Sequence, residues 1–284
     1  MHDFSKASGH EGCQLQDILT ISSQVLSALS FLHSQVGVIH TDLKPQNILF
    51  AEQANRRVKL IDFGGARYMK DVEDIVWHET PEISSFRYRA PELHLRIEWS
   101  NLIDVWSFGC IVMELYTCSP LFQVSDHVAS MPELSIDAVM EYCVLEHLVL
   151  VECVLGDIPV SMLHDVSDET RNKNVRINLV DMDSWSLSMD RLPNESKVHV
   201  NRHRHVSKQL GGERASVRDF IRALLTIDPS ERPPSSSLRK RPRLPSCSMR
   251  YAYNRNTEAC GMSAECLHTC MRSQSAMHCS SSFL

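Results

Sequence analysis

The chain has 284 residues, of which 43% are hydrophobic and 23% are charged. This length allows one large or two small domains, and the hydrophobic content predicts a packed core instead of a disordered chain. The formal net charge of −6, from 29 basic and 35 acidic residues, does not indicate nucleic-acid binding. No apolar run approaches the length of a membrane span, and residues 1–12 lack a hydrophobic signal core. We therefore expect an intracellular protein, nuclear or cytoplasmic and not secreted, without direct nucleic-acid or membrane partners.

The first predicted elements are one helix and three small strands. Apolar residues recur at helical spacing from Leu15 to Leu32, which predicts an amphipathic helix of about five turns. Short apolar runs then follow at 38–39, 48–50 and 58–63, and the turn-forming residues between them indicate strands. A helix that leads into small strands with polar loops between them is a scaffold for a loop-based active site.

The next elements alternate between loops and helices. Residues 64–90 lack periodicity and predict a long loop, which is unusual unless the loop is functional. Residues 104–116 would place apolar side chains on nearly every face of a helix, which predicts a buried central helix. A further helix is predicted over 133–155 with Gly156 as its stop, and the polar stretch from about 157 to 212 shows no clear element.

The last predicted helix carries an apolar stripe from Val217 to Leu225 and ends before Asp228. Periodicity then disappears after Arg243, and residues 244–284 form a Cys/Met/Ser-rich tail that we expect to be disordered. Mostly helix with a few short strands makes the fold class α+β, mainly α.

Nine of the ten cysteines fall into two groups. Four lie in apolar helical patterns, where a reduced thiol packs as a small hydrophobic group: Cys110, Cys118, Cys143 and Cys153. Five lie in the tail, together with His268 and His278: Cys247, Cys260, Cys266, Cys270 and Cys279. Their spacing matches no zinc template, so a disordered tail is favoured over a metal site.

Two short motifs carry the chemistry. Residues 40–47 read HTDLKPQN, and DFG follows at 62–64, twenty residues after Asp42. Together they resemble the catalytic loop and the metal-binding loop of protein kinases. Phosphoryl transfer asks the protein mainly to align the nucleophile and to neutralise charge on the phosphates. In that interpretation Asp42 orients the attacking hydroxyl and accepts its proton, and Lys44 stabilises the transferred phosphoryl group.

The resemblance implies ATP and Mg²⁺ as cofactors. Asn47 and Asp62 offer the hard oxygen ligands that Mg²⁺ prefers, and Leu49 and Ile61 would form the floor of the adenine site. Upstream of His40 we find no glycine-rich phosphate loop and no strand lysine. We therefore expect a kinase large lobe with the small β lobe absent. Such a lobe alone would transfer phosphate poorly, and its exposed pocket floor would face water.

Three further positions match the kinase pattern. Ala90-Pro91-Glu92 resembles the end of an activation segment, which would then span 62–92. The sequence DVWSFG from Asp104 resembles the start of the buried kinase F helix, where Asp104 would hold the catalytic-loop backbone at His40. Arg232 occupies the place of the arginine that pairs with Glu92 in this family, so we expect a buried ion pair there. His40, Glu92, Asp104 and Arg232 are thus structural candidates.

The details resemble one branch of the kinases. YRAPE at 88–92 is similar to the CMGC group, and HTDLKPQNILF at 40–50 to the LAMMER (CLK) type. EHLVLVECVLG at 146–156 keeps part of the LAMMER signature, and SRPK-type kinases are the nearest competitor. The large lobe would span 1–243, with the family's variable insert at about 157–212. The resemblance implies a Ser/Thr or dual-specificity kinase acting on protein substrates, with Arg/Ser-rich splicing factors as the family's substrates.

Substrate-side residues follow from the same comparison. Ser85 takes the place of a family threonine, where its hydroxyl can bridge Asp42 and Lys44, and Arg89 is a substrate-positioning candidate. Thr41 stands where most kinases have an arginine that pairs with an activation-loop phosphate, so we expect activity without that phosphate. Phe86 stands where LAMMER kinases have an arginine, so the resemblance does not carry over that family's recognition of substrate charge at this position.

Several alternatives stay open at this stage. The chain could be one part of an active kinase, or it could be a non-catalytic interaction module. A small-molecule phosphotransferase is disfavoured by the peptide-kinase motifs. Glu146 and Glu152 either favour cationic peptides or mark a solvated helix face. The run from Arg239 to Arg243 is either a nuclear-import patch or a solvated basic run.

Overall fold

The computed structural model describes residues 15–52, 57–72, 83–125, 134–167, 175–177, 185–187 and 189–239. The predicted tail with its cysteines and histidines lies outside the described residues. So do Glu133 and the basic run beyond Arg239.

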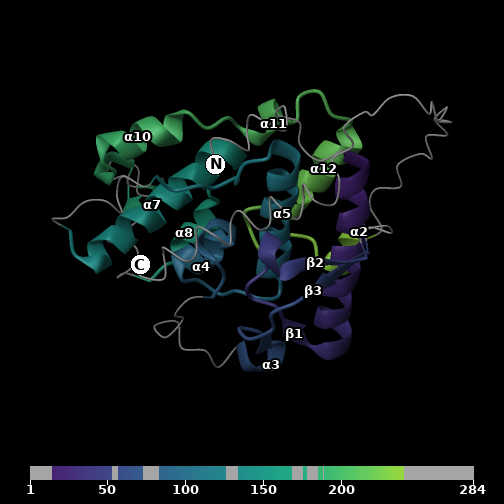
Figure 1. The fold of residues 1–284 in the computed structure, drawn as a ribbon. Helices are drawn as coiled ribbons and strands as arrows, with labels where there is room; N and C mark the ends of the chain where they lie inside the picture. The colour runs from purple at the N-terminus through teal and green to yellow at the C-terminus, as the bar shows by residue number, and fades with distance from the viewer. Residues whose placement is uncertain are drawn as a thin grey trace.

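Two long helices form the centre of the molecule. Helix α2 (Leu15–Phe31) continues into one π-helical turn, η1 (Leu32–Val36), which Gly37 ends with a left-handed φ of 70°. Helix α2 packs against α5 (Leu102–Thr117), which is buried on nearly every side (Figure 1). The predicted amphipathic helix and the predicted buried helix are both confirmed.

Helix α5 is the core around which the later helices pack. Helix α12 (Ala215–Leu224) contacts it where Gly109 lies. A Cβ at Gly109 would stand 2.8 Å from Leu225 Cδ2, so glycine is what allows this close approach. Helix α7 (Ile136–Leu155) begins at the Ser135 N-cap and ends at Gly156, as predicted within a few residues.

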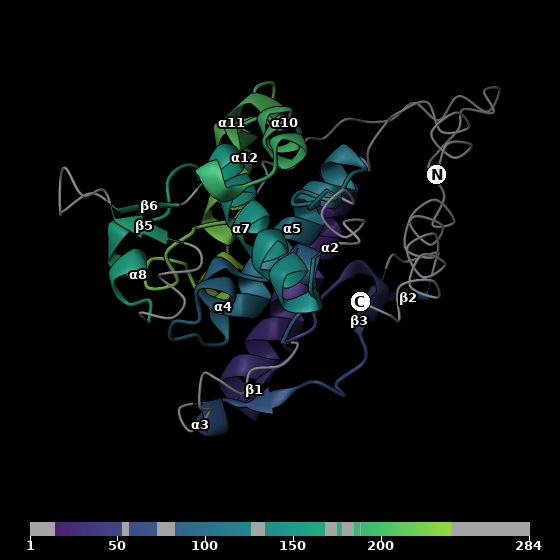
Figure 2. The same ribbon diagram turned by 90° about the vertical axis from the view of Figure 1, so that its left-hand side faces the viewer.

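The described strands form three two-stranded antiparallel ribbons, which lie apart from one another around the helices (Figure 2). The pairs are β1 (Val38–Ile39) with β4 (Arg67–Tyr68), β2 (Ile48–Glu52) with β3 (Arg57–Leu60), and β5 (Val175–Ile177) with β6 (Trp185–Leu187). The three predicted strands are confirmed, although the third ends at Leu60 and not at 63. Strands β1 and β2 flank residues 40–47 and hold both ends of that loop.

The two stretches without predicted elements contain short ones. Residues 64–90 contain β4, α3 (Met69–Val72) and η4 (Phe86–Tyr88). Residues 157–212 contain β5, β6, α8 (Val160–His164), η5 (Met189–Arg191), α10 (Asn194–Asn201) and α11 (Val206–Gln209). Also missed were η2 (Pro45–Asn47), α4 (Pro91–Leu95) and α13 (Ser235–Leu238). Hydrophobic periodicity is read over windows longer than these elements, so it cannot detect them. The helix-rich α+β class is nonetheless confirmed.

Two composition-based expectations need correction. By length and composition the helix at 15–36 could cross a membrane, contrary to our expectation that no apolar run comes close. Its inner face, however, packs on α5, β3 and α13, as in the core helix of a folded domain. Among the four cysteines predicted in helices, Cys110 is buried, Cys143 and Cys153 are half-buried, and Cys118, which caps the end of α5, is exposed.

Candidate active site

The loop at 40–47 is held by one buried carboxylate. Asp104, in the first turn of α5, is 1% exposed. It accepts hydrogen bonds from the backbone N–H groups of His40 (2.8 Å) and Thr41 (3.0 Å). His33 Nε2 lies 2.8 Å from the same carboxylate, and its Nδ1 lies 3.4 Å from Ser235 Oγ. The predicted role of Asp104 is confirmed, whereas His33 was missed because a helical histidine carries no motif.

Thr41 adopts a strained backbone at this point. Its φ is 70°, in the left-handed region that β-branched residues avoid, at a cost of about 1–3 kcal/mol. The bond to Asp104 opposes this strain, and so does a 2.8 Å hydrogen bond from Thr41 Oγ1 to the Gly65 carbonyl. A Cβ at residue 65 would lie 3.1 Å from that hydroxyl, so the glycine permits the contact. Thr41 thereby ties the loop at 40–47 to the DFG segment.

The predicted catalytic residues meet in one cluster. Lys44 Nζ lies 2.7 Å from Asp42 Oδ2. Ser85 donates to Asp42 Oδ1 from its hydroxyl (2.8 Å) and its backbone N–H (3.1 Å). Lys44 Nζ also donates to Ser85 Oγ at 3.3 Å. The expected bridge of Ser85 between Asp42 and Lys44 is therefore present, although residue 85 is more than forty positions away in sequence.

This cluster keeps Asp42 ionised. Partial burial alone would raise the pKa of Asp42. The hydrogen bonds from Lys44 and Ser85 and the Lys44 charge outweigh that effect and hold the pKa below its usual value. A carboxylate that stays charged at neutral pH can accept a hydrogen bond from an incoming hydroxyl and orient it.

The candidate metal ligands lie on neighbouring segments, since Ile61 N–H donates to the Asn47 carbonyl. Asn47 is buried and donates from Nδ2 to the Asp42 carbonyl at 2.7 Å, which leaves its amide oxygen as the atom for a cation. Asp62 is exposed with φ 64°, and its carboxylate forms no hydrogen bond with the described residues. One amide oxygen and one carboxylate are a donor set that fits a hydrated Mg²⁺ carrying phosphates.

The predicted adenine floor lies beside these ligands. Leu49 on β2 is 43% exposed. Ile61 is half-buried, and its N–H donates to the Asn47 carbonyl at 3.0 Å. Exposure of Leu49 agrees with the expectation that the pocket floor faces water.

Arg89 holds the loop that presents Ser85. Its Nε donates to the Ile83 carbonyl at 3.0 Å and its Nη2 to the Ser84 carbonyl at 2.9 Å. Ser84 has a left-handed φ of 69°, so these bonds stabilise a strained turn. These contacts of Arg89 are to the loop backbone, through which it positions Ser85.

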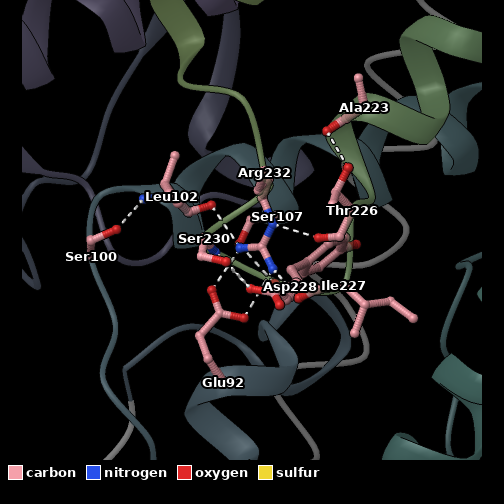
Figure 3. A network of polar contacts seen from close by, with 11 residues as sticks. Glu92, Ser100, Leu102, Ser107, Ala223, Thr226, Ile227, Asp228, Ser230 and Arg232 are labelled. Atoms are coloured by element: carbon pink, nitrogen blue, oxygen red, sulfur yellow. Dashed lines mark hydrogen bonds and ion pairs between the residues drawn. The ribbon is translucent and has the colours of Figure 1, made fainter. Parts of the chain in front are cut away.

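The predicted ion pair between Glu92 and Arg232 is confirmed and fully buried (Figure 3). Arg232 Nη1 and Nη2 donate to the two carboxylate oxygens at 2.6 and 3.0 Å. The remaining N–H groups of Arg232 donate to the backbone carbonyls of Leu102, Thr226 and Ile227. All five guanidinium donors therefore have acceptors. The pair fixes the end of the 62–92 segment to the start of α5 and the loop after α12.

An aromatic cluster beneath this segment was not predicted. Phe86 packs edge-on against His94 and His147, with ring centroids 4.8 and 5.3 Å apart. The two histidine rings lie 4.5 Å from each other, and both are buried. Among the described residues, none provides a hydrogen-bond partner for any of their four ring nitrogens. The position at which LAMMER kinases carry arginine is thus occupied here by a ring in a buried cluster.

The two interpretations of Glu146 are both wrong. The carboxylate is fully buried and accepts hydrogen bonds from Ser125 N (2.6 Å), Ser125 Oγ (3.1 Å) and Ser196 Oγ. His199 Nε2 lies 4.0 Å away. Glu146 therefore joins α7 to α10 and is available neither to solvent nor to a peptide. Glu152 is half-buried and accepts a bond from Ile158 N–H at 3.3 Å.

Comparison with known proteins agrees with this geometry. A family model described as "Protein kinase domain" matches residues 2–243. The chain is 30% identical over 258 residues to the serine/threonine-protein kinase AFC2 of Arabidopsis thaliana, covering 82% of this chain and 54% of AFC2. It is 29% identical over 252 residues to the human dual specificity protein kinase CLK4, covering 81% of this chain and 45% of CLK4. The chain thus spans about half the length of these relatives.

The fold also matches a solved structure of a kinase domain. The crystal structure of the PF14_0431 kinase domain matches with a TM-score of 0.62 at 25% identity, covering 84% of this chain and 68% of that chain. The predicted resemblance to CLK-type kinases is confirmed by these comparisons. The predicted absence of a small lobe stays a prediction.

Proposed function

Because this chain belongs to the protein kinase domain family, we propose that it serves ATP-dependent phosphorylation of protein hydroxyl groups, with Ser/Thr or dual specificity. The cluster of Asp42, Lys44 and Ser85 is the observation that supports this proposal most strongly. Asp42 would hold the acceptor hydroxyl and take its proton, and Lys44 would place a positive charge beside the transferred group. Bound Mg²⁺ would neutralise charge on the phosphates, with Asn47 and Asp62 as its protein ligands.

The proposals about the substrate and the cellular location rest on family resemblance. Arg/Ser-rich protein substrates are proposed from the similarity to CLK-type kinases, but Glu146 gives this no support because it is buried. A nuclear or cytoplasmic location is proposed on the same basis. If the small lobe is absent from the working protein, the chain would act as a non-catalytic interaction module, and the following experiment distinguishes the two functions.

Mg-ATP is expected to stabilise the wild-type chain and not the Asp62→Ala variant. A ligand at about one hundred times its Kd adds about 2.7 kcal/mol to the free energy of unfolding, which a thermal shift detects. Asp42→Asn should keep this shift, yet lose at least about 100-fold in phosphate transfer to a serine peptide, because the base is gone. No shift with a folded wild-type chain would reject ATP binding and favour the interaction module.

Phosphatase treatment is expected to leave most of the transfer activity. Thr41 cannot form an ion pair with a phosphate, and its neutral hydrogen bond to Gly65 holds the 62–92 segment without one. Peptide phosphorylation before and after phosphatase is the measurement, and loss of all activity in the treated sample would contradict the prediction.

The variant Thr41→Val keeps the shape of the side chain but loses the hydrogen bond to Gly65, so its free energy of unfolding should fall by about 1–3 kcal/mol.

A further inference from the structure

One segment of this acidic chain has a purely basic character. Residues 196–212 contain four of the chain's 29 basic residues and none of its 35 acidic ones. The four are Lys197 on α10, Arg202 and Arg204 in the link after it, and Lys208 on α11. We call these four residues the basic strip. None of the roles argued above for catalysis or core packing uses it.

The charges of the basic strip are not neutralised within the described residues. Arg202, Arg204 and Lys208 are exposed, and their head groups form no ion pair or hydrogen bond in the part of the chain that the structure describes. Lys197 donates only to the Asp190 carbonyl, at 3.0 Å. Like charges in one short segment repel, so an anionic partner would be favoured there.

The backbone beneath the strip is held in place. Helix α10 packs on α7, and His199 Nε2 lies 2.7 Å from the Gln123 carbonyl. Gln209 Nε2 donates to the Arg204 carbonyl at 2.6 Å, and the His205 side chain caps α11 by accepting from Ser207 N–H. A surface ordered before binding has less conformational entropy to lose when a partner binds.

We propose that the basic strip binds an Asp/Glu-rich segment of a partner protein. The four charges lie on two helices and the link between them, which fits several distributed carboxylates better than one phosphate. Residues 193–212 contain no Phe, Tyr or Trp on which nucleic-acid bases could stack. The acidic remainder of the chain would also repel a long polyanion, whereas a short acidic segment contacts the strip alone.

The position of the strip leaves the active site open. In both views α10 and α11 lie at the opposite end of the molecule from β1 and α3 (Figures 1 and 2). The catalytic loop begins directly after β1, so a bound partner would not cover it. The inference therefore does not depend on phosphoryl transfer by this chain.

The test is fluorescence anisotropy of the full chain with a labelled peptide that alternates glutamate and glycine, at low salt. The variant Arg202→Gln/Arg204→Gln/Lys208→Gln should bind about tenfold more weakly, since three exposed ion pairs are lost. The matched control Arg57→Gln/Lys59→Gln/Lys70→Gln removes the same charge from exposed positions elsewhere and should bind as the wild type does.

Three results would overturn the proposal. Equal losses in both triple variants would show non-specific attraction. Tighter binding of a phosphoserine peptide of equal charge would assign the strip to phosphorylated partners. An RNA oligonucleotide that binds the wild type more tightly than the peptide, and loses this in the strip variant, would assign it to nucleic acid.

Discussion

Replacing Arg232 with alanine is expected to lower the free energy of unfolding by about 3–5 kcal/mol, which corresponds to a fall in Tm of roughly 10 °C. The variant leaves the Glu92 carboxylate buried without a counter-charge. It also removes the donors to three backbone carbonyls, at Leu102, Thr226 and Ile227. Each buried acceptor without a donor adds a desolvation cost. Urea unfolding followed by circular dichroism measures the difference.

Variants of the same pair should form a graded series. Arg232→Lys keeps the charge but has three donors in place of a planar fork of five, so it should lose about half as much. Glu92→Gln keeps an acceptor oxygen for the guanidinium and leaves the three carbonyl contacts intact, so it should also lose less than Arg232→Ala. Arg222→Ala, at an exposed position on α12, is the control and should change stability by less than about 0.5 kcal/mol. A loss below about 1 kcal/mol in Arg232→Ala would contradict the series.

Most of the candidate site could be predicted because its residues lie in short contiguous motifs. Asp42, Lys44 and Asn47 share one loop, and Asp62 heads another, so spacing along the chain carries the chemistry. The long-range partners are different. Glu92 and Arg232 are 140 residues apart, and only the family resemblance pairs them before the structure is known. Packing alone determines which distant segments meet.

The contacts that the sequence did not predict also join residues that are far apart along the chain. His33 contacts Asp104 and Ser235 from positions 71 and 202 residues away. Glu146 was assigned to a helix surface because charge is normally solvated, yet α10 covers it with Ser196. That helix lies in the stretch at 157–212, where no periodicity was found, so the burial of Glu146 could not be anticipated.

Acidification from pH 7.5 to pH 5 is expected to destabilise the protein through His94 and His147. Burial lowers the pKa of His147 to about 3, and the nearby Arg89 charge adds to this effect. Burial, with the adjacent His147 and Arg89, lowers the pKa of His94 well below its usual value. Both rings are therefore neutral in the folded state, whereas in the unfolded chain they titrate near pH 6.5. Below that pH the unfolded state binds more protons, so stability is lost as the pH falls.

The magnitude follows from proton linkage. His147 should cost about 2 kcal/mol between pH 7.5 and pH 5, and His94 should add a loss in the same direction. The variant His94→Leu/His147→Leu removes both titrating groups and keeps the cluster apolar, so its stability should depend less on pH over this range. His164→Gln, at an exposed position on α8, is the matched control and should keep the wild-type slope. Denaturant unfolding at several pH values measures these slopes. Equal slopes in the wild type and the double variant would contradict the prediction, because they would mean that the two histidines bind protons in the folded state as they do in the unfolded chain.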